Sequence, residues 1–273
     1  MSKVLLSVSS SGLSNRLHAH ASAVLLGPRL GREPRIHWPL TEQLSVQFKD
    51  MFTTEWPIIN ASELNHTLFR TERSAKIYNS ADQFKIRPDD KEEIVMVKTW
   101  GHFCLAGDDV QEAKKEVVKV LRQLKPVAEV SLRVEALLSQ VQQPFVGIHI
   151  RTCDMVGLHF CKAPNRGINR VNEVFAKTHT SFVEQARPWV EKGYGVFVCS
   201  DDVKHEQAVI NSFPEVTVRQ HKGVGWRETI DGMLEALVDL YTLAKAECVI
   251  GTKNSDFSIL AAELGNGQLT VSQ

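Results

Sequence analysis

The chain of 273 residues has no apolar run of the roughly 20 residues that a membrane-spanning helix needs, and it carries no net charge. Its opening segment, "MSKVLLSVSSSG", is too short and too polar for a secretory signal peptide. Because 32 basic residues balance 32 acidic ones, the overall charge provides no attraction to nucleic acid or to an anionic membrane. We therefore expect a soluble, cytoplasmic protein with no membrane span and no nucleic-acid partner.

Cysteine is scarce, and its distribution argues against a disulfide framework. The five cysteines are odd in number and scattered along the chain, at Cys104, Cys153, Cys161, Cys199 and Cys248. Cys199 and Cys248 lie inside apolar runs that are typical of strands, so we expect reduced side chains in the core.

Several motifs of metal sites and enzymes are also missing. His149, Cys153, His159 and Cys161 carry atoms that zinc binds, but their irregular spacing matches no closed site, so we predict no metal. No Asp-x-Asp triplet is present, which argues against a sugar transferase that holds its nucleotide through a metal. The glycine-rich signatures of α/β-hydrolases, P-loop kinases and classical dehydrogenases are absent, which argues against those three classes.

What the chain has instead is an alternation of apolar, strand-like runs with helical patterns. The first half begins with a strand in "KVLLSVSS" and a helix in "RLHAHASAVLLGPRLG", which we expect to stop at Gly27 and Pro28. A weaker strand follows in "PRIHW", and a clear one spans 93–100. The sequence of residues 41–93 is largely polar and has no regular period, so it predicts no definite helix or strand before the strand at 93–100.

The second half repeats strand and helix more regularly. The predicted strands are 145–150, 195–200, 215–219, 248–251 and 268–271, and the predicted helices are 172–192, 203–213, 227–246 and 255–264. This order predicts an α/β fold with a doubly wound parallel sheet. Two helical patterns meet at Pro126, so we expect an N-terminal Rossmann-like domain over 1–126 and a C-terminal one over 127–273.

Polar side chains follow several of these strands, at the sheet edge where ligands of such folds bind. Arg151 follows strand 145–150, and its permanently charged guanidinium can hold two phosphate oxygens at once. Ser255 is placed to begin the helix after "GTKNS", where unpaired backbone N–H groups form a site for phosphate. Asp202 and Asp239 could accept hydrogen bonds from a ribose or a base. Together these groups indicate a nucleoside diphosphate.

Each of these residues also has a purely structural interpretation. Arg151 could be an ordinary surface or ion-pair residue. Asp201 and Asp202 could simply begin helix 203–213. Asp239 lies opposite the apolar stripe of its helix, so the periodicity alone predicts a solvent-exposed face.

The order of these motifs resembles the fucosyltransferase superfamily, which includes the α1,6-fucosyltransferases and the protein O-fucosyltransferases. "GIHIRTCDMVG" resembles its His-x-Arg motif, and "VCSDDVKHEQAV" resembles a second motif, a strand that ends in Asp-Asp. "EALVDLYTLAKAECVIGTKNSDFSILAAELG" resembles the third, and "GLSNRLHAHASA" is similar to the glycine-containing opening of these enzymes. The resemblance is strongest over 145–264 and weaker over 1–52.

The resemblance implies a GT-B type glycosyltransferase, with two Rossmann-like domains facing across a cleft. The C-terminal domain would hold the nucleotide sugar, the N-terminal domain would form the acceptor side, and neither a metal nor another cofactor would be required. Arg151 would stabilise the leaving diphosphate. The other residues implied to bind the donor are Asn15, Arg16, His149, Asp202, Asp239, Asn254 and Ser255.

The sequence also departs from the family's pattern. Where α1,6-fucosyltransferases continue with a second Arg, a Lys and a Glu, this chain has Thr152, Met155 and His159. If that Glu is the base, His159 could take its place, because a neutral imidazole can accept a proton from a hydroxyl near pH 7. A His beside Phe160 could equally be a packed side chain.

The hypothesis is therefore an inverting, metal-independent glycosyltransferase, with a nucleotide-sugar donor and a carbohydrate acceptor as partners. It would transfer a sugar, L-fucose from GDP-fucose in the first instance, to a glycan hydroxyl. One alternative is a related transferase with another donor, such as UDP-xylose or a deoxyhexose nucleotide. The other is a non-catalytic protein of the same fold that binds a nucleotide sugar or a glycan.

Overall fold

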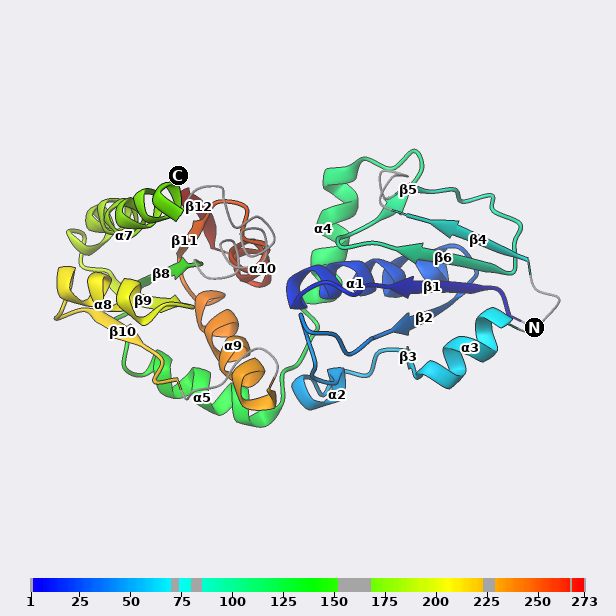
Figure 1. The fold of residues 1–273 in the computed structure, drawn as a ribbon, viewed down its shortest axis with the longest axis horizontal. Helices are drawn as coiled ribbons and strands as arrows, with labels where there is room; N and C mark the ends of the chain where they lie inside the picture. The colour runs from blue at the N-terminus through cyan, green and yellow to red at the C-terminus, as the bar shows by residue number, and fades with distance from the viewer. Residues whose placement is uncertain are drawn as a thin grey trace. The chain divides into compact units, whose positions relative to one another are not determined.

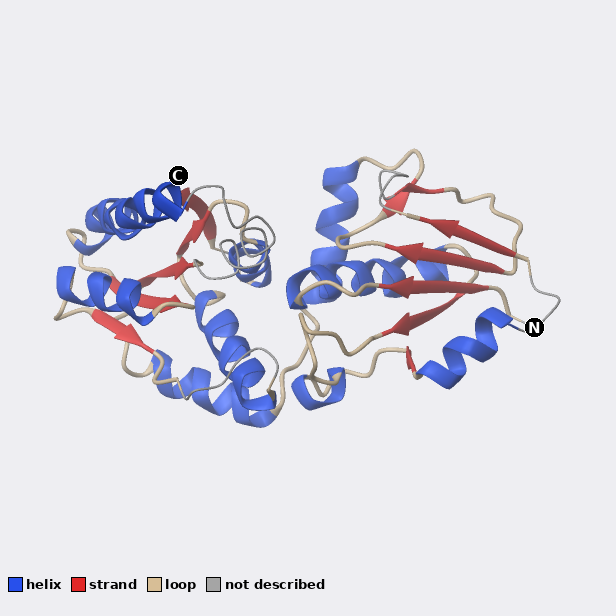
Figure 2. Cartoon of the chain, in the orientation of Figure 1, coloured by secondary structure: helices blue, strands red, loops and turns tan. Residues whose placement is uncertain are grey.

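The computed structural model describes residues 2–69, 74–79, 85–151, 168–222, 229–265 and 267–272, with the side chains of 67–69 and 168–178 left out. The chain divides into two compact units. Unit 1 comprises Met1–Val127 and Val224–Leu234, and unit 2 comprises Ala128–Gly223 and Glu235–Gln273. Each unit has its own parallel sheet with helices packed against it (Figures 1 and 2).

Unit 1 contains the first eleven elements. They are β1 (Val4–Val8), α1 (Leu13–Arg29), β2 (Glu33–His37), α2 (Phe48–Met51), β3 (Ile58–Ile59), α3 (Ala61–Phe69), β4 (Ala75–Tyr78), β5 (Lys85–Ile86), β6 (Ile94–Lys98), β7 (Cys104–Leu105) and α4 (Val110–Leu121). Five of the strands form a parallel sheet in the order β3-β2-β1-β6-β4. Successive side chains of a strand point to opposite faces, so Leu5 and Val95 pack with Leu26 of α1, while Val4, Leu6 and Met96 form the core of the other face.

Unit 2 contains the remaining elements, with α9 beginning in the segment assigned to unit 1. They are α5 (Ala128–Leu138), β8 (Phe145–Ile150), α7 (Ile168–Val190), β9 (Gly195–Ser200), α8 (Val203–Ser212), β10 (Thr217–Arg219), α9 (Ile230–Leu243), β11 (Cys248–Thr252), α10 (Asp256–Leu264) and β12 (Gln268–Ser272). The sheet order is β10-β9-β8-β11-β12, and every pair is parallel. β8 and β9 are fully buried, as expected of central strands covered on both faces.

Both sheets reverse their strand order next to their first strand. In unit 2 the chain moves from β8 outward to β9 and β10, and then returns to place β11 on the other side of β8. In doubly wound folds, ligands bind at such a switch point, beyond the carboxyl ends of the strands. The predicted α/β fold with two doubly wound domains is confirmed, and the ends of β8 and β11 become the place to look for a site.

One prediction for the first half was wrong, because helix α1 does not stop at Gly27 and Pro28. It begins three residues earlier than expected and continues to Arg29. A Cβ on Gly27 would lie 3.0 Å from the ring of Pro34, so the glycine allows close approach to β2. Pro28 lies in the last turn and removes only the single hydrogen bond that its N–H would donate one turn back.

Two further expectations concern cysteines and membranes. Cys104, Cys199 and Cys248 are buried and free, so the prediction of reduced core cysteines is confirmed for the two named residues, whereas Cys153 and Cys161 lie outside the described residues. No helix within the described ranges combines the length and the apolar character required to cross a bilayer.

Candidate functional site

The switch point of the unit 2 sheet is held together by Thr252, the last residue of β11. Its hydroxyl accepts a hydrogen bond from the backbone N–H of Arg151 at 2.9 Å and donates to the carbonyl of His149 at 3.3 Å. Arg151 is partly buried and follows β8 directly. Because its backbone is fixed to the neighbouring strand, its side chain starts from a rigid position at the sheet edge.

His149 is fixed on the face of the same sheet that α10 covers. It is 8% exposed, its Nδ1 lies 2.8 Å from the hydroxyl of Ser258, and its ring centroid lies 4.7 Å from that of Phe257. Gly251 of β11 pairs with His149 in the sheet. The absence of a side chain at Gly251 makes room for Ser258, since a Cβ on Gly251 would lie 2.5 Å from Ser258 Oγ. The structure therefore brings His149 and Arg151 to the same strand end.

Helix α10 begins beside this strand end, as predicted. Ser255 is its N-cap residue, but its side chain makes no capping hydrogen bond, and its buried Oγ has no hydrogen-bond partner. Asn254 precedes it in the left-handed conformation with φ of 61°, which asparagine tolerates better than most residues. The first N–H groups of a helix lack intrahelical partners, so this end of α10 is suited to an anion.

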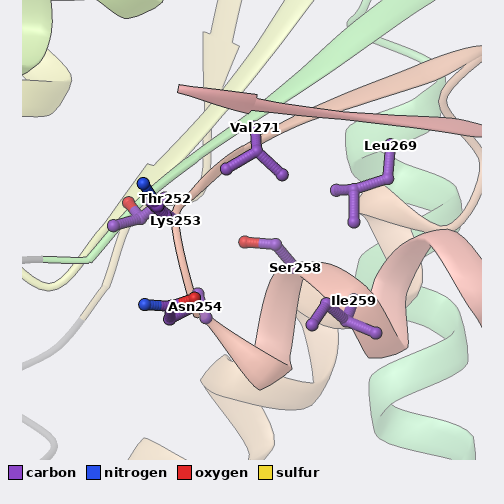
Figure 3. A pocket seen from close by; sticks show the side chains of 8 residues that line it. Thr252, Lys253, Asn254, Ser258, Ile259, Leu269 and Val271 are labelled. Atoms are coloured by element: carbon purple, nitrogen blue, oxygen red, sulfur yellow. The ribbon is translucent and has the colours of Figure 1, made fainter. Parts of the chain in front are cut away.

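A pocket of about 310 Å³ opens at the same place (Figure 3). Its lining consists of Thr252, Lys253, Asn254, Ser255, Ser258, Ile259, Leu269 and Val271. One wall is polar and comes from the end of β11 and the start of α10, and the other is apolar and comes from β12 and α10. The predicted residues Asn254 and Ser255 thus line a pocket together with Thr252, the residue that binds the backbone N–H of Arg151.

Asp239 belongs to a second polar cluster, beyond the ends of β9 and β10. Its two carboxylate oxygens accept hydrogen bonds at 2.8 Å from Lys222 Nζ and from the Gln220 amide. Lys222 also donates to the carbonyl of Ser200 at 2.9 Å and to Glu206 Oε1 at 3.2 Å. Asp239 is only 5% exposed, so the solvent-exposed face that the periodicity predicted for it is wrong, because α9 is covered on nearly all sides.

The cluster contains two cations and two carboxylates, because Arg219 Nη1 also lies 3.6 Å from Glu206 Oε2. Burial alone would lower the pKa of Lys222, but Asp239 and Glu206 together raise it above its ordinary value. Burial raises the pKa of the Glu206 carboxyl, and the ammonium of Lys222 opposes that shift. Lys222, whose side chain is 26% exposed, joins two buried carboxylates, so this cluster is a support for the ends of β9 and β10.

Asp202 acts first as a helix cap. Its Oδ1 accepts the backbone N–H of Lys204 at 2.9 Å, and its own N–H donates to Ser200 Oγ at 3.0 Å. The structural interpretation of this residue is therefore confirmed, and a contact from it to a ligand stays a prediction.

Asn15 and Arg16 lie in the first turn of α1, in unit 1. Asn15 is partly exposed, whereas Arg16 is fully buried. The Arg16 guanidinium donates to the carbonyls of Ser10, Ser11 and Pro39 and, at 2.7 Å, to the hydroxyl of Thr41. Its Cζ also lies 5.3 Å from the centroid of the Trp38 ring, and burial lowers its pKa to about 10. Arg16 thus ties together the loops after β1 and β2, and a donor contact from it stays a prediction.

His159 lies outside the described residues, and so does the rest of the segment after Arg151 up to residue 167. Its predicted role as a base is therefore untested. Within the ranges that the structure describes, no three metal-binding side chains come together, and of the four residues weighed for zinc only His149 falls in those ranges.

Sequence reasoning missed the residues that position the predicted ones. Thr252 and Ser258 hold Arg151 and His149, and Lys222 and Gln220 hold Asp239. A weak signal existed for Thr252, as the last residue of an apolar run next to a predicted site. No local signal marks Lys222, because its partner lies 17 positions further along the chain on another element.

No protein-family model matches the sequence, and a sequence search of curated proteins gave no match. Solved structures do match. A Bradyrhizobium NodZ α1,6-fucosyltransferase crystallised with GDP matches with a TM-score of 0.62 and 20% identity, over 97% of this chain and 93% of that one. An Arabidopsis thaliana FUT1 mutant with GDP matches with a TM-score of 0.66 and 17% identity, over 99% of this chain and 70% of that one.

A structure of POFUT1 with GDP-fucose matches with a TM-score of 0.62 and 13% identity, over 100% of this chain and 98% of that one. At these identities the likeness concerns the fold. The predicted resemblance to the fucosyltransferase superfamily is confirmed at that level: the chain has the GT-B fold that these fucosyltransferases share.

Proposed function

We propose that this protein is a glycosyltransferase that uses GDP-fucose as its donor and transfers L-fucose to a hydroxyl of a glycan. The observation that carries the proposal is the position of Arg151, whose backbone is fixed by Thr252 at the switch point of the unit 2 sheet. The fold of the chain matches fucosyltransferase structures with GDP or GDP-fucose bound, which supports it. A nucleoside diphosphate needs a fixed cation and unpaired N–H donors. Arg151 and the start of α10 are suited to supply them.

The proposed reaction depends on charge that develops on the leaving group. When the bond between the sugar carbon and the diphosphate breaks, negative charge accumulates on the β-phosphate. A guanidinium held in place at that point stabilises the transition state without having to reorganise. The proposal includes inversion at the sugar carbon and no requirement for a metal, since Arg151 takes the part of the cation.

In this proposal the two polar regions of unit 2 bind different parts of the donor. The phosphates belong at Arg151 and the start of α10, with His149 lining the same strand end. The nucleoside belongs toward the ends of β9 and β10, where Asp202 and the Asp239 cluster lie. His159 is the proposed acceptor base, and its variant His159→Ala should slow transfer and change the pH profile.

The experiment is turnover of labelled sugar nucleotides with and without a chelator. We expect hydrolysis or transfer with GDP-fucose to exceed that with UDP-xylose or a dTDP-deoxyhexose, and we expect activity to persist in EDTA. Turnover of another donor in preference to GDP-fucose would overturn the donor assignment. Binding of GDP-fucose without any turnover, across a panel of glycan acceptors, would contradict the enzymatic proposal.

A further inference from the structure

Two large apolar side chains are exposed beyond the strand ends of the unit 1 sheet. Trp100, after β6, is 56% exposed, and Leu40, after β2, is 49% exposed. Within the part of the chain that the structure describes, Trp100 is the only aromatic side chain among the exposed large hydrophobic residues. Burying a tryptophan removes a large apolar area from water, so an exposed tryptophan offers a large contact area to a ligand.

Between the loops that carry these two side chains lies the loop after β1, in which Ser9 is buried, Ser10 is exposed and Ser11 is partly exposed. β2, β1 and β6 are neighbours in the sheet, and their carboxyl ends lie at one edge (Figure 1). The N–H of Thr99 donates to the carbonyl of Val8, so Trp100 continues beside Ser9. Ser9 and Ser11 share a hydrogen bond of 2.9 Å between their hydroxyls. The loops that carry Trp100 and Leu40 are therefore two strand spacings apart, on the order of 10 Å.

Both loops are held firmly at their ends. The hydroxyl of Thr99 accepts the N–H of Gly101 at 3.2 Å, and the buried Phe103 donates its N–H to Ser22 Oγ at 3.1 Å. On the other side, Arg16 binds the loops after β1 and β2 to each other. The surface is therefore preorganised, which lowers the entropic cost of binding a ligand.

We propose that Trp100 is the stacking platform of a carbohydrate-binding surface formed by Trp100, Ser10, Ser11 and Leu40, which holds the acceptor glycan. A pyranose ring has an apolar face of C–H groups and a rim of hydroxyls, which matches an indole ring beside serines. Exposed Lys98 and Ser10 interrupt the apolar surface, so it suits a sugar better than an apolar protein face. The assignment of the ligand as an acceptor rests on the proposed function, whereas the binding of carbohydrate at Trp100 is tested without it.

The test is direct binding of β-linked tetrasaccharides, with no donor present. The full chain is titrated with cellotetraose, chitotetraose, mannotetraose and galactotetraose up to about 10 mM, since millimolar dissociation constants are measurable there. We expect the wild type to bind at least one of them. Trp100→Ala should weaken that affinity at least about 10-fold, and Trp100→Phe, which keeps an aromatic face, should stay within about 3-fold.

Two controls separate this inference from folding and from the donor. Leu132→Ala removes a side chain that is 65% exposed on α5 and should leave binding unchanged. The thermal shift produced by GDP should be the same in wild type and Trp100→Ala. No binding of any tetrasaccharide by the wild type, or equal affinity in Trp100→Ala, overturns the inference. A wild type that binds a tetrasaccharide through Trp100 but shows no GDP shift would overturn the proposed function alone.

Discussion

Each unit has an arginine close to the carboxyl end of its first strand, and the two arginines differ in their burial and in their hydrogen bonds. Arg16 is fully buried, and its guanidinium donates to three backbone carbonyls and to Thr41. Arg151 is partly buried, and its backbone N–H donates to the hydroxyl of Thr252. The comparison teaches that a position near a strand end does not decide the role of an arginine, because the guanidinium of Arg16 serves to hold two loops together.

Removal of the buried Arg16 side chain should have the largest effect. Arg16→Ala leaves the carbonyls of Ser10, Ser11 and Pro39 without their donor and should lower the free energy of unfolding by about 3–5 kcal/mol. Urea denaturation measures this. Arg29→Ala, on the same helix but with its side chain 46% exposed, should stay within about 0.5 kcal/mol of wild type. A stable Arg16→Ala protein would show that the loops after β1 and β2 do not depend on this residue.

Arg151→Ala should have the converse effect, on turnover and not on stability. Loss of a charge that stabilises the leaving group should reduce turnover by about 10²-fold, while the unfolding midpoint stays that of wild type. Arg151→Lys should recover only part of the rate, because an ammonium lacks the planar pair of donors. Exposed Arg122, as Arg122→Ala, is the matched control for loss of an arginine. A destabilised Arg151→Ala would place this residue with Arg16 as a support.

The Lys222→Met variant tests whether the Asp239 cluster stabilises unit 2 as Arg16 stabilises unit 1. In Lys222→Met, Asp239 loses its cation and Glu206 keeps only the more distant Arg219, so the pKa values of both carboxyls should rise further above the ordinary range. A carboxyl whose pKa is raised by folding favours the folded state at low pH and loses that contribution as the pH rises through the raised value. The variant should therefore be destabilised by about 2 kcal/mol at pH 8 and by less at pH 5.

Denaturation at several pH values measures that difference, with exposed Lys204→Met as the control. A loss of stability that is the same at pH 5 and pH 8 would mean that the two carboxylates do not depend on Lys222 for their charge.

The smallest expected effect concerns Asp202. Asp202→Ala removes the cap of α8 and should cost about 1 kcal/mol, whereas Asp202→Asn should cost little, because an amide oxygen caps nearly as well. If the nucleoside also contacts this carboxylate, Asp202→Asn should weaken donor binding while leaving stability intact. Equal donor affinity in Asp202→Asn and wild type would limit the residue to capping.

The fold of the second half could be predicted because its elements carry their own signals. Strands 145–150 and 195–200 were predicted with their observed bounds, and the other strands and helices predicted for that half within about four residues, since buried strands and amphipathic helices have distinct periods. Residues 41–93 could not be predicted in the same way. β3 and β5 have two residues each, which is too short for any period to show.

The candidate site was less predictable than the fold. Sequence order brings Arg151 and Ser255 to the same sheet edge, because parallel strands end together. It could not show that Asp239 is buried, since the residues that enclose α9 are distant in sequence. Nor could it show that Arg16 binds Pro39 and Thr41, more than 20 positions away. Long-range partners decide the state of a charged side chain, and a single sequence does not record them.

The central claim is that Arg151 binds the β-phosphate of a guanosine diphosphate, and a comparison of GDP with GMP tests it most directly. Calorimetric titration should give at least about 10-fold tighter binding of GDP than of GMP to wild type, because only GDP carries the second phosphate. In Arg151→Ala this difference should disappear, with GMP affinity unchanged. Equal affinities for GDP and GMP in wild type, or a full preference for GDP in Arg151→Ala, would contradict the account.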